Sequence, residues 1–343
     1  MPQLTSAFAG ALLLAAPTVA EPRAARTDAS SVAFRIVVHG ETEAIANTVL
    51  AEMEAVMRRE LRTSHIDAGD FSTANGELSF VATDAGNISP AADIARRQIS
   101  IAAISGKYAT LSGADNWEVR ITAPNQVTLR PTKALLDAAA DSAMITVRDL
   151  ISRRLIDLGA HVDQAKRIDA QNILVEIRGV TDVRRVRAVI TRPARLRVSQ
   201  VDLTALPERV ASGRAPVGSQ ILVTSQGERV AVSHRVLISN EHLTDAYGAI
   251  DKLSNGSIIA VRLNDLGTQR LANFTRENVG RSFAIVMDNL VLATPIINRP
   301  MTDGVVQIGG NFSREEAADI ALSLRAGPLP INVSITAERV VQR

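Results

Sequence analysis

The pattern of apolar and polar positions changes period several times along the chain. Apolar and polar residues alternate over 117–122, and a β-branched run fills 32–38, so both segments predict strands. Over 132–158 the apolar positions are separated by steps of three and four residues, which predicts one long amphipathic helix. Strands and helices that follow one another in this way predict an α+β fold.

The same reasoning places further elements along the sequence. Helices are predicted over 41–61, 91–104 and 182–190, and strands over 76–81, 172–178, 194–201, 257–263 and 331–341. Thr132 is the expected N-cap of the long helix and Gly159 its expected stop. Arg153 is expected to pair with Asp149 and with Asp157, each four residues away.

Local motifs mark the C-terminal third. Asp288 and Asn289 can supply positive φ angles, so they predict a two-residue hairpin between FAIVM and LVLAT. Ser313 with Glu316 predicts a capping box that opens a helix. The segment 203–218 contains Pro and Gly but no apolar period, which makes it the expected domain boundary.

The most specific segment of the chain runs from Thr275 to Pro330. It begins TRENVGRSFAIVMDN, continues through GGNFSREEAADI and ends in LRAGPLP. This order resembles the head of the large periplasmic domain of SecD, the accessory subunit of the bacterial protein-export channel. A second block, from DLISRRLIDLG through NILVEIRGVTD to RPARLRV, is similar to the base of that domain.

The resemblance implies a ferredoxin-like base layer with an α+β head subdomain inserted into it. The expected divisions are a signal peptide (1–20), a linker (21–31), an amino-terminal part of the base (32–130), a base subdomain (131–203), a second linker (204–228), the head (229–330) and a strand returning to the base (331–343). The residues that carry the head motif are Thr275, Arg276, Glu277, Asn278, Val279, Gly280, Arg281, Phe283, Asn311, Phe312, Arg325, Ala326 and Gly327.

An apolar run near the start of the sequence predicts export. Residues 7–20 form a run shorter than the roughly 20 residues that a membrane-spanning helix needs, but suited to a signal peptide cleaved after Ala20. No Lys or Arg precedes the run. A mis-set start codon or a degenerate anchor is therefore the alternative.

Composition narrows the classes of function. The 38 basic and 36 acidic residues leave a formal net charge of +2, which gives no strong attraction to nucleic acid. The absence of cysteine excludes disulfides, thiolate metal sites and a cysteine nucleophile. Aromatic residues make up only 3% of the chain, so stacking on bases or sugars would have few side chains to use.

Conventional catalytic patterns are missing from the sequence. The five histidines, at positions 39, 65, 161, 234 and 242, show no HxH, HxxxH or HExxH spacing, so no metal site is expected. Neither a phosphate-binding glycine motif nor GxSxG occurs. Asp288 and Asp303 could be imagined as a carboxylate pair, but they lie on turn-forming segments without a nucleophile nearby. We therefore expect a protein that is not an enzyme and has no cofactor.

Arginines concentrate between positions 178 and 197, where seven arginines accompany one acid, Asp182. The helical and strand periods predict a basic face formed by Arg184, Arg185, Arg187, Arg195 and Arg197. Such a face is a solvated amphipathic surface, a contact for anionic lipid or an acidic partner, or a contact for nucleic acid phosphates. The lack of interleaved aromatic residues disfavours nucleic acid.

The resemblance implies a role in protein export. We expect a periplasmic protein that binds unfolded or translocating polypeptide, or that docks on the Sec translocase or on a separate membrane-embedded SecD/SecF-like subunit. A membrane surface is a further candidate partner. Since no bundle of membrane helices follows in this sequence, we expect no proton-driven motor in this chain. The alternatives are a structural or decoy envelope paralogue that only assembles with a partner, and an unrecognised periplasmic hydrolase.

Overall fold

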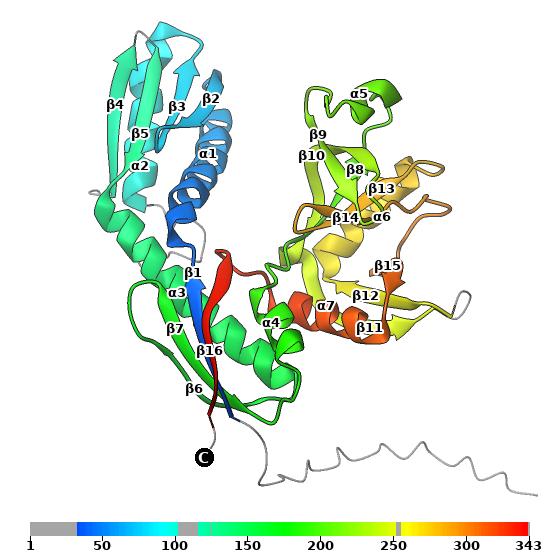
Figure 1. The fold of residues 1–343 in the computed structure, drawn as a ribbon. Helices are drawn as coiled ribbons and strands as arrows, with labels where there is room; N and C mark the ends of the chain where they lie inside the picture. The colour runs from blue at the N-terminus through cyan, green and yellow to red at the C-terminus, as the bar shows by residue number, and fades with distance from the viewer. Residues whose placement is uncertain (1–32, 102–115, 124, 252–254, 342–343) are drawn as a thin grey trace, which may run out of the picture.

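The computed structural model describes residues 33–101, 116–123, 125–251 and 255–341. The predicted signal peptide, the linker that follows it and the end of the helix predicted over 91–104 lie outside these residues. Figure 1 shows three parts, which we call the base, the arm and the head. The arm and the head both rise from the base.

The base is one sheet covered by two helices. Its elements are β1 (Ala33–Gly40), α3 (Lys133–Asp157), β6 (His161–Arg167), β7 (Asn172–Arg178), α4 (Val183–Thr191) and β16 (Val333–Val341). The strand order is β16-β1-β7-β6 and all three pairings are antiparallel. This is the βαββαβ order of a ferredoxin-like layer, so the predicted α+β class and the ferredoxin-like base are confirmed.

Local sequence explains the base helix α3. The Thr132 side chain accepts a hydrogen bond from the backbone N–H of Leu135 (3.3 Å), as the predicted N-cap requires. The apolar stripe of α3 is buried, including Val147 and Ile151. Of the ion pairs expected for Arg153 neither forms, because Asp149 pairs with Arg148 and Asp157 pairs with Arg325 of the head.

The arm is a separate layer inserted between β1 and α3. Its elements are α1 (Ile45–Thr63), β2 (Ala68–Ala74), β3 (Glu77–Ala82), α2 (Ile88–Ile101), β4 (Trp117–Ala123) and β5 (Gln126–Pro131). They form a sheet of order β2-β3-β5-β4 with both helices packed against it. The expectation that 32–130 belongs to the base is therefore wrong except for β1. Periodicity predicted the elements but not the sheet that each strand joins.

The head combines a small barrel with a three-stranded sheet. The barrel consists of β8 (Leu196–Val201), β9 (Ser219–Thr224), β10 (Arg229–Ser239), β13 (Phe283–Met287) and β14 (Leu290–Ala293). The sheet consists of β11 (Leu243–Ile250), β12 (Ser257–Leu263) and β15 (Val305–Phe312). Helices α5 (Pro207–Ala211), α6 (Asp265–Glu277) and α7 (Arg314–Ala326) complete the head. Helix α7 packs on β11 and β12 and also contacts α3 and α4.

The head begins earlier than expected. Strand β8, predicted as part of the base, pairs with β10 and β13 of the barrel. The expected linker 204–228 contains α5 and β9, and β9 pairs with β10. The alternating pattern of β8 predicted a strand correctly, but pairing partners about forty and ninety residues away left no local signal.

Two local motifs fold as predicted. Asp288 and Asn289 adopt φ angles of 52° and 67° between β13 and β14, which confirms the hairpin. The Ser313 side chain accepts from the N–H of Glu316 (3.0 Å), and the Glu316 carboxylate accepts from the N–H of Ser313 (2.8 Å), which confirms the capping box of α7.

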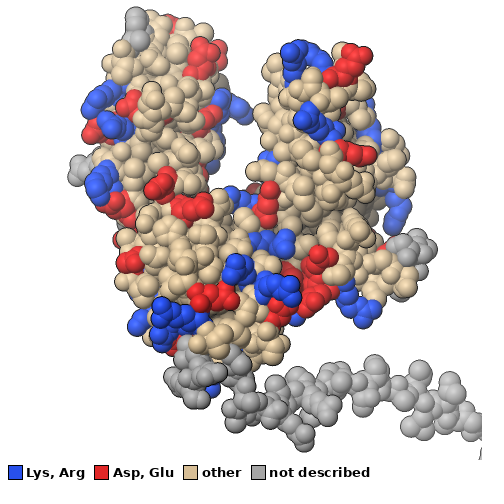
Figure 2. All heavy atoms as spheres, viewed as in Figure 1, with Lys and Arg blue, Asp and Glu red and all other residues tan. Residues whose placement is uncertain are grey.

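Figure 2 shows that the arm and the head are separated by open space above the base. The base core continues into the arm as one apolar cluster, whereas the head has apolar clusters of its own. None of the helices within the described residues has an apolar stretch sufficient to cross a bilayer.

Candidate functional site: the head loops and the joint with the base

The first half of the head motif holds two loops together. Thr275 is fully buried in the last turn of α6. Its hydroxyl donates to the carbonyl of Leu271 (2.8 Å) and accepts from the backbone N–H of Met301 (2.9 Å). Thr275 therefore ties the segment after β14 to the end of α6.

Backbone hydrogen bonds extend this connection. The N–H of Gly280 donates to the carbonyl of Ile297, and the N–H of Ile297 donates to the carbonyl of Arg281, both at 2.8 Å. Gly280 has a φ of 84°, which favours glycine at this turn. We call the two segments, 278–282 and 294–301, the loop pair.

The loop pair presents apolar side chains to solvent. Val279 is 53% exposed and Ile296 is 61% exposed, one on each segment. Arg276, Arg281 and Arg299 are exposed on or beside the same segments. Since a buried threonine, a glycine turn and backbone hydrogen bonds fix the two segments, the apolar side chains lie on a supported surface.

The remaining motif residues of the head have varied roles. Phe283 is buried in the apolar core of the head. Glu277 and Asn311 are exposed, and Phe312 is half-buried at the end of β15. A Cβ at Gly310 would lie 2.5 Å from the Phe312 ring, so glycine is needed there. The structure therefore does not bring all predicted motif residues into one surface.

The last motif residues belong to the joint between head and base. The Arg325 guanidinium donates to Asp157 of α3 (3.0 Å) and to the carbonyl of Ala246 in β11 (3.3 Å). Ala326 is half-buried, and Gly327 ends α7 with a φ of 105°. This part of the motif connects α7 of the head to the base.

A buried arginine at the joint escaped the sequence reasoning. Arg154 of α3 is 0% exposed, and its guanidinium donates to the carbonyls of Val189 (3.0 Å), Arg192 (2.5 Å) and Gly327 (2.8 Å). Burial lowers the pKa of Arg154 to about 10, so it stays charged at neutral pH. The available signal was its position beside the apolar stripe of α3, where a solvent-facing arginine is the ordinary expectation.

The predicted basic face is divided by the fold. Arg185 donates to Asp319 of α7 (2.7 Å), and this hydrogen bond raises the pKa of Arg185. Arg187 pairs with Glu338 of β16 (2.7 Å). Among the five predicted arginines, two are thus neutralised within the chain, so the expectation of one common basic face is wrong. Arg184 stays exposed on α4.

The other two predicted arginines, Arg195 and Arg197, line a cavity of about 580 Å³ at the joint. Its other walls include Pro193, Val236, Ser239, Asp288 and Asn332, which come from both head and base. The Arg195 guanidinium donates to the carbonyl of Leu329 (3.2 Å). Arg197 is half-buried, and its Nη2 atom is buried without a hydrogen-bond partner. Desolvation lowers the pKa of Arg197.

The wall of this cavity is braced by side chains that bind the backbone. The Asp288 carboxylate accepts from the N–H groups of Ala194 (3.2 Å) and Arg195 (2.8 Å). The Asn240 side chain accepts from the N–H of Leu196 and donates to the carbonyl of Ala194, both at 2.9 Å. Ala194 has a φ of 59°, a conformation that non-glycine residues rarely adopt, and these contacts support it.

Asp288 and Asp303 do not act as the carboxylate pair considered from the sequence. Asp288 holds the backbone of 194–195, whereas Asp303 accepts from the N–H of Val305 (3.3 Å) at the start of β15. His242 is buried, and the part of the chain that the structure describes contains no cluster of three His, Asp or Glu side chains able to hold a metal ion.

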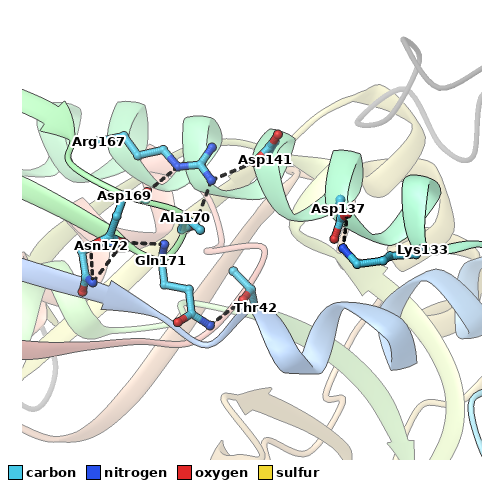
Figure 3. Close-up of polar contacts among 9 residues, drawn as sticks. All are labelled: Thr42, Lys133, Asp137, Asp141, Arg167, Asp169, Ala170, Gln171 and Asn172. Atoms are coloured by element: carbon cyan, nitrogen blue, oxygen red, sulfur yellow. Dashed lines mark hydrogen bonds and ion pairs between the residues drawn. The ribbon is translucent and has the colours of Figure 1, made fainter.

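A polar network at the other end of the base is structural. Figure 3 shows Arg167 between Asp141 of α3 and the turn that joins β6 to β7. The Asp169 carboxylate accepts from the Asn172 side chain and from the N–H groups of Gln171 and Asn172. These hydrogen bonds lower the pKa of Asp169, that of the Asn172 side chain most. The network fixes the turn and offers no free charged group.

The edge of the head sheet is partly blocked. The N–H of Ala246 in β11 donates to the Asp245 carboxylate (2.8 Å), and the Ala246 carbonyl accepts from Arg325. Tyr247 and Ile250 are exposed farther along β11. Since the polar groups of Ala246 are already bonded, the loop pair is a better binding surface than this edge.

Comparison with known proteins gives the same assignment as the motif. Residues 219–331 match the family model described as SecDF, P1 head subdomain. The resemblance to the SecD family is confirmed. The matched residues begin at β9 and so leave β8 of the barrel outside the SecD match.

Curated relatives extend the similarity beyond the head. The chain is 31% identical over 208 residues to a protein translocase subunit SecD of Acetobacter pasteurianus, covering 60% of this chain and 39% of that one. It is 25% identical over 320 residues to the SecD of Calditerrivibrio nitroreducens, covering 90% of this chain and 59% of that one. The chain thus spans about two fifths of the length of the first relatives.

Solved SecDF structures are also similar to this chain. A crystal structure of SecDF in a super-membrane-facing form has a TM-score of 0.47 at 24% identity, covering 58% of this chain and 28% of that one. A structure of SecDF described as a membrane component that enhances protein export has a TM-score of 0.46 at 22% identity, covering 66% of this chain and 98% of that one.

Proposed function

We propose that this chain binds unfolded or translocating polypeptide in protein export, through the loop pair of its head. The observation that carries the proposal is the exposure of Val279 and Ile296 on two segments that are tied together by Thr275 and by backbone hydrogen bonds. A fixed apolar surface binds extended chains with little ordering cost on the protein side.

The comparisons support the biological setting of the proposal. The matched relatives are named protein translocase subunits, so the proposed partners are polypeptide in transit and the Sec translocase. A periplasmic, membrane-associated location follows from the same similarity and belongs to the proposal. The proposed role is binding, and no residue is assigned to catalysis.

The size of the expected effect follows from the exposed area. Full burial of a Val or Ile side chain stabilises by about 1.5–3 kcal/mol, and each of these side chains has about half of its surface still to bury. The two together contribute about 2 kcal/mol, which corresponds to roughly thirty-fold in Kd.

The test measures binding of the purified protein to a permanently unfolded, fluorescently labelled client. The double variant Val279→Ser with Ile296→Ser should weaken saturable binding by roughly thirty-fold. The control is Ile156→Ser, which removes an equally exposed apolar side chain (60%) from α3 of the base. Equal binding by the double variant and the control would refute the loop pair as the site. Capture of only a folded envelope protein would favour the assembly role instead.

A further inference from the structure

Arg197 is an unpaired cation in the wall of the cavity at the joint. Within the described residues it forms no ion pair, and its Nη2 atom is buried without a partner. Taking a guanidinium partly out of water without a counter-charge is unfavourable, and desolvation lowers its pKa accordingly. The cost would be offset by an anion that enters the cavity.

Resting on the proposed function, we propose that this cavity receives one acidic side chain, Asp or Glu, of the polypeptide bound by the head. The Arg197 guanidinium would bind the carboxylate, because its planar donor fork matches two carboxylate oxygens. The hydroxyl of Ser239 and the amide of Asn289 stand in the same wall and can donate further hydrogen bonds.

The charges of the wall favour a monoanion over a phosphate dianion. Arg197 is the unpaired cation, while Arg195 already donates to the Leu329 carbonyl. The Asp288 carboxylate also lines the cavity and is held by the N–H groups of residues 194 and 195, so it adds a fixed negative charge. One additional negative charge is balanced by Arg197, whereas two would leave an excess.

The cavity also accepts the chain that carries such a side chain. Its volume of about 580 Å³ lies within the range of ligand sites, and Pro193, Leu196 and Val236 give it an apolar portion. Val236 is 41% exposed, so the apolar portion opens to solvent. An extended segment with apolar residues around one acid fits this combination.

The experiment uses two labelled peptides that share one apolar, extended sequence and differ only in a central Glu or Gln. Fluorescence anisotropy with the full chain should give at least about fivefold tighter binding of the Glu peptide, as expected for a hydrogen-bonded charge. Arg197→Gln should abolish this preference. Arg184→Gln, which removes an exposed arginine outside the cavity, should keep it.

A second variant keeps the test valid if Arg197→Gln folds poorly. Asn289→Asp places a carboxylate in the cavity wall at a position that tolerates a positive φ, and should reduce the Glu preference while Arg197 is intact. Acetate should compete with the Glu peptide more effectively than inorganic phosphate.

The outcomes separate this inference from the proposed function. Equal affinity for the Glu and Gln peptides, or a preference that survives both cavity variants, overturns the acidic-residue site while binding of unfolded client stands. Stronger competition by phosphate overturns the carboxylate assignment. A Glu preference without any binding of unfolded client would support the cavity and refute the loop-pair function.

Discussion

Replacing Arg154 by methionine should destabilise the joint between head and base. Arg154 is fully buried and its guanidinium bonds three carbonyls, those of Val189, Arg192 and Gly327. Val189 is in α4, Arg192 follows α4 where the chain leaves for the head, and Gly327 follows α7 where it returns. One side chain therefore holds both crossings. Methionine approximates the length of the arginine stem and cannot donate a hydrogen bond.

The magnitude follows from the acceptors left behind. An unsatisfied buried acceptor costs about 1–3 kcal/mol, and three of them at the low end cost about 3 kcal/mol. The low end applies because methionine also removes the unfavourable burial of a charge, which is the cause of the lowered pKa of Arg154. For a structural unit of about 150–250 residues, this loss lowers Tm by roughly 6–12 °C.

The assay is equilibrium unfolding in urea, followed by far-ultraviolet circular dichroism, with a thermal melt in parallel. Arg153→Met is the matched control, since Arg153 is the preceding residue of the same helix and is exposed. It should change the free energy of unfolding by less than about 0.5 kcal/mol. A loss below about 1 kcal/mol for Arg154→Met, or equal losses for both variants, would refute the assignment of Arg154 as the bond between the crossings.

Two further predictions concern single polar contacts. Thr275→Val removes the hydroxyl that accepts from the N–H of Met301 while keeping the side-chain shape, so it should cost about 1–3 kcal/mol and increase hydrogen exchange at Met301; unchanged exchange would contradict the proposed tie between the loops. Asp169 has a depressed pKa in the folded protein, so its stabilisation is fully present above its unfolded pKa of about 3.9 and is lost as the pH falls through the lower folded value. Asp169→Asn should flatten that part of the acid-unfolding profile, and an identical profile for variant and parent would show that the carboxylate hydrogen bonds do not stabilise the fold.

Short-range sequence features determined the local elements. The N-cap at Thr132, the hairpin at Asp288 and Asn289, and the capping box at Ser313 all formed where the sequence predicted them. Each depends on residues within a few positions of one another, so the information is contained in a short window. The head motif likewise carried the family assignment, since its order of residues is specific.

The partners of those elements were decided by the tertiary structure. The alternating pattern of β8 was read correctly as a strand, but its pairing with β10 and β13 placed it in the head and not in the base. The strands at 68–74, 126–131, 161–167 and 219–224 were not predicted, because partly exposed or short strands have weak periodicity.

The candidate sites show the same division for charged residues. The sequence determined that Arg185, Arg187 and Arg197 lie in a basic segment, but it could not distinguish an arginine paired with Asp319 from one left without a partner. Arg154 had no sequence signal at all, since its three acceptors come from positions 35 to 173 residues away. Hydrogen bonds and charge pairs of this range exist only after the chain has folded, because burial and direction decide which donor meets which acceptor.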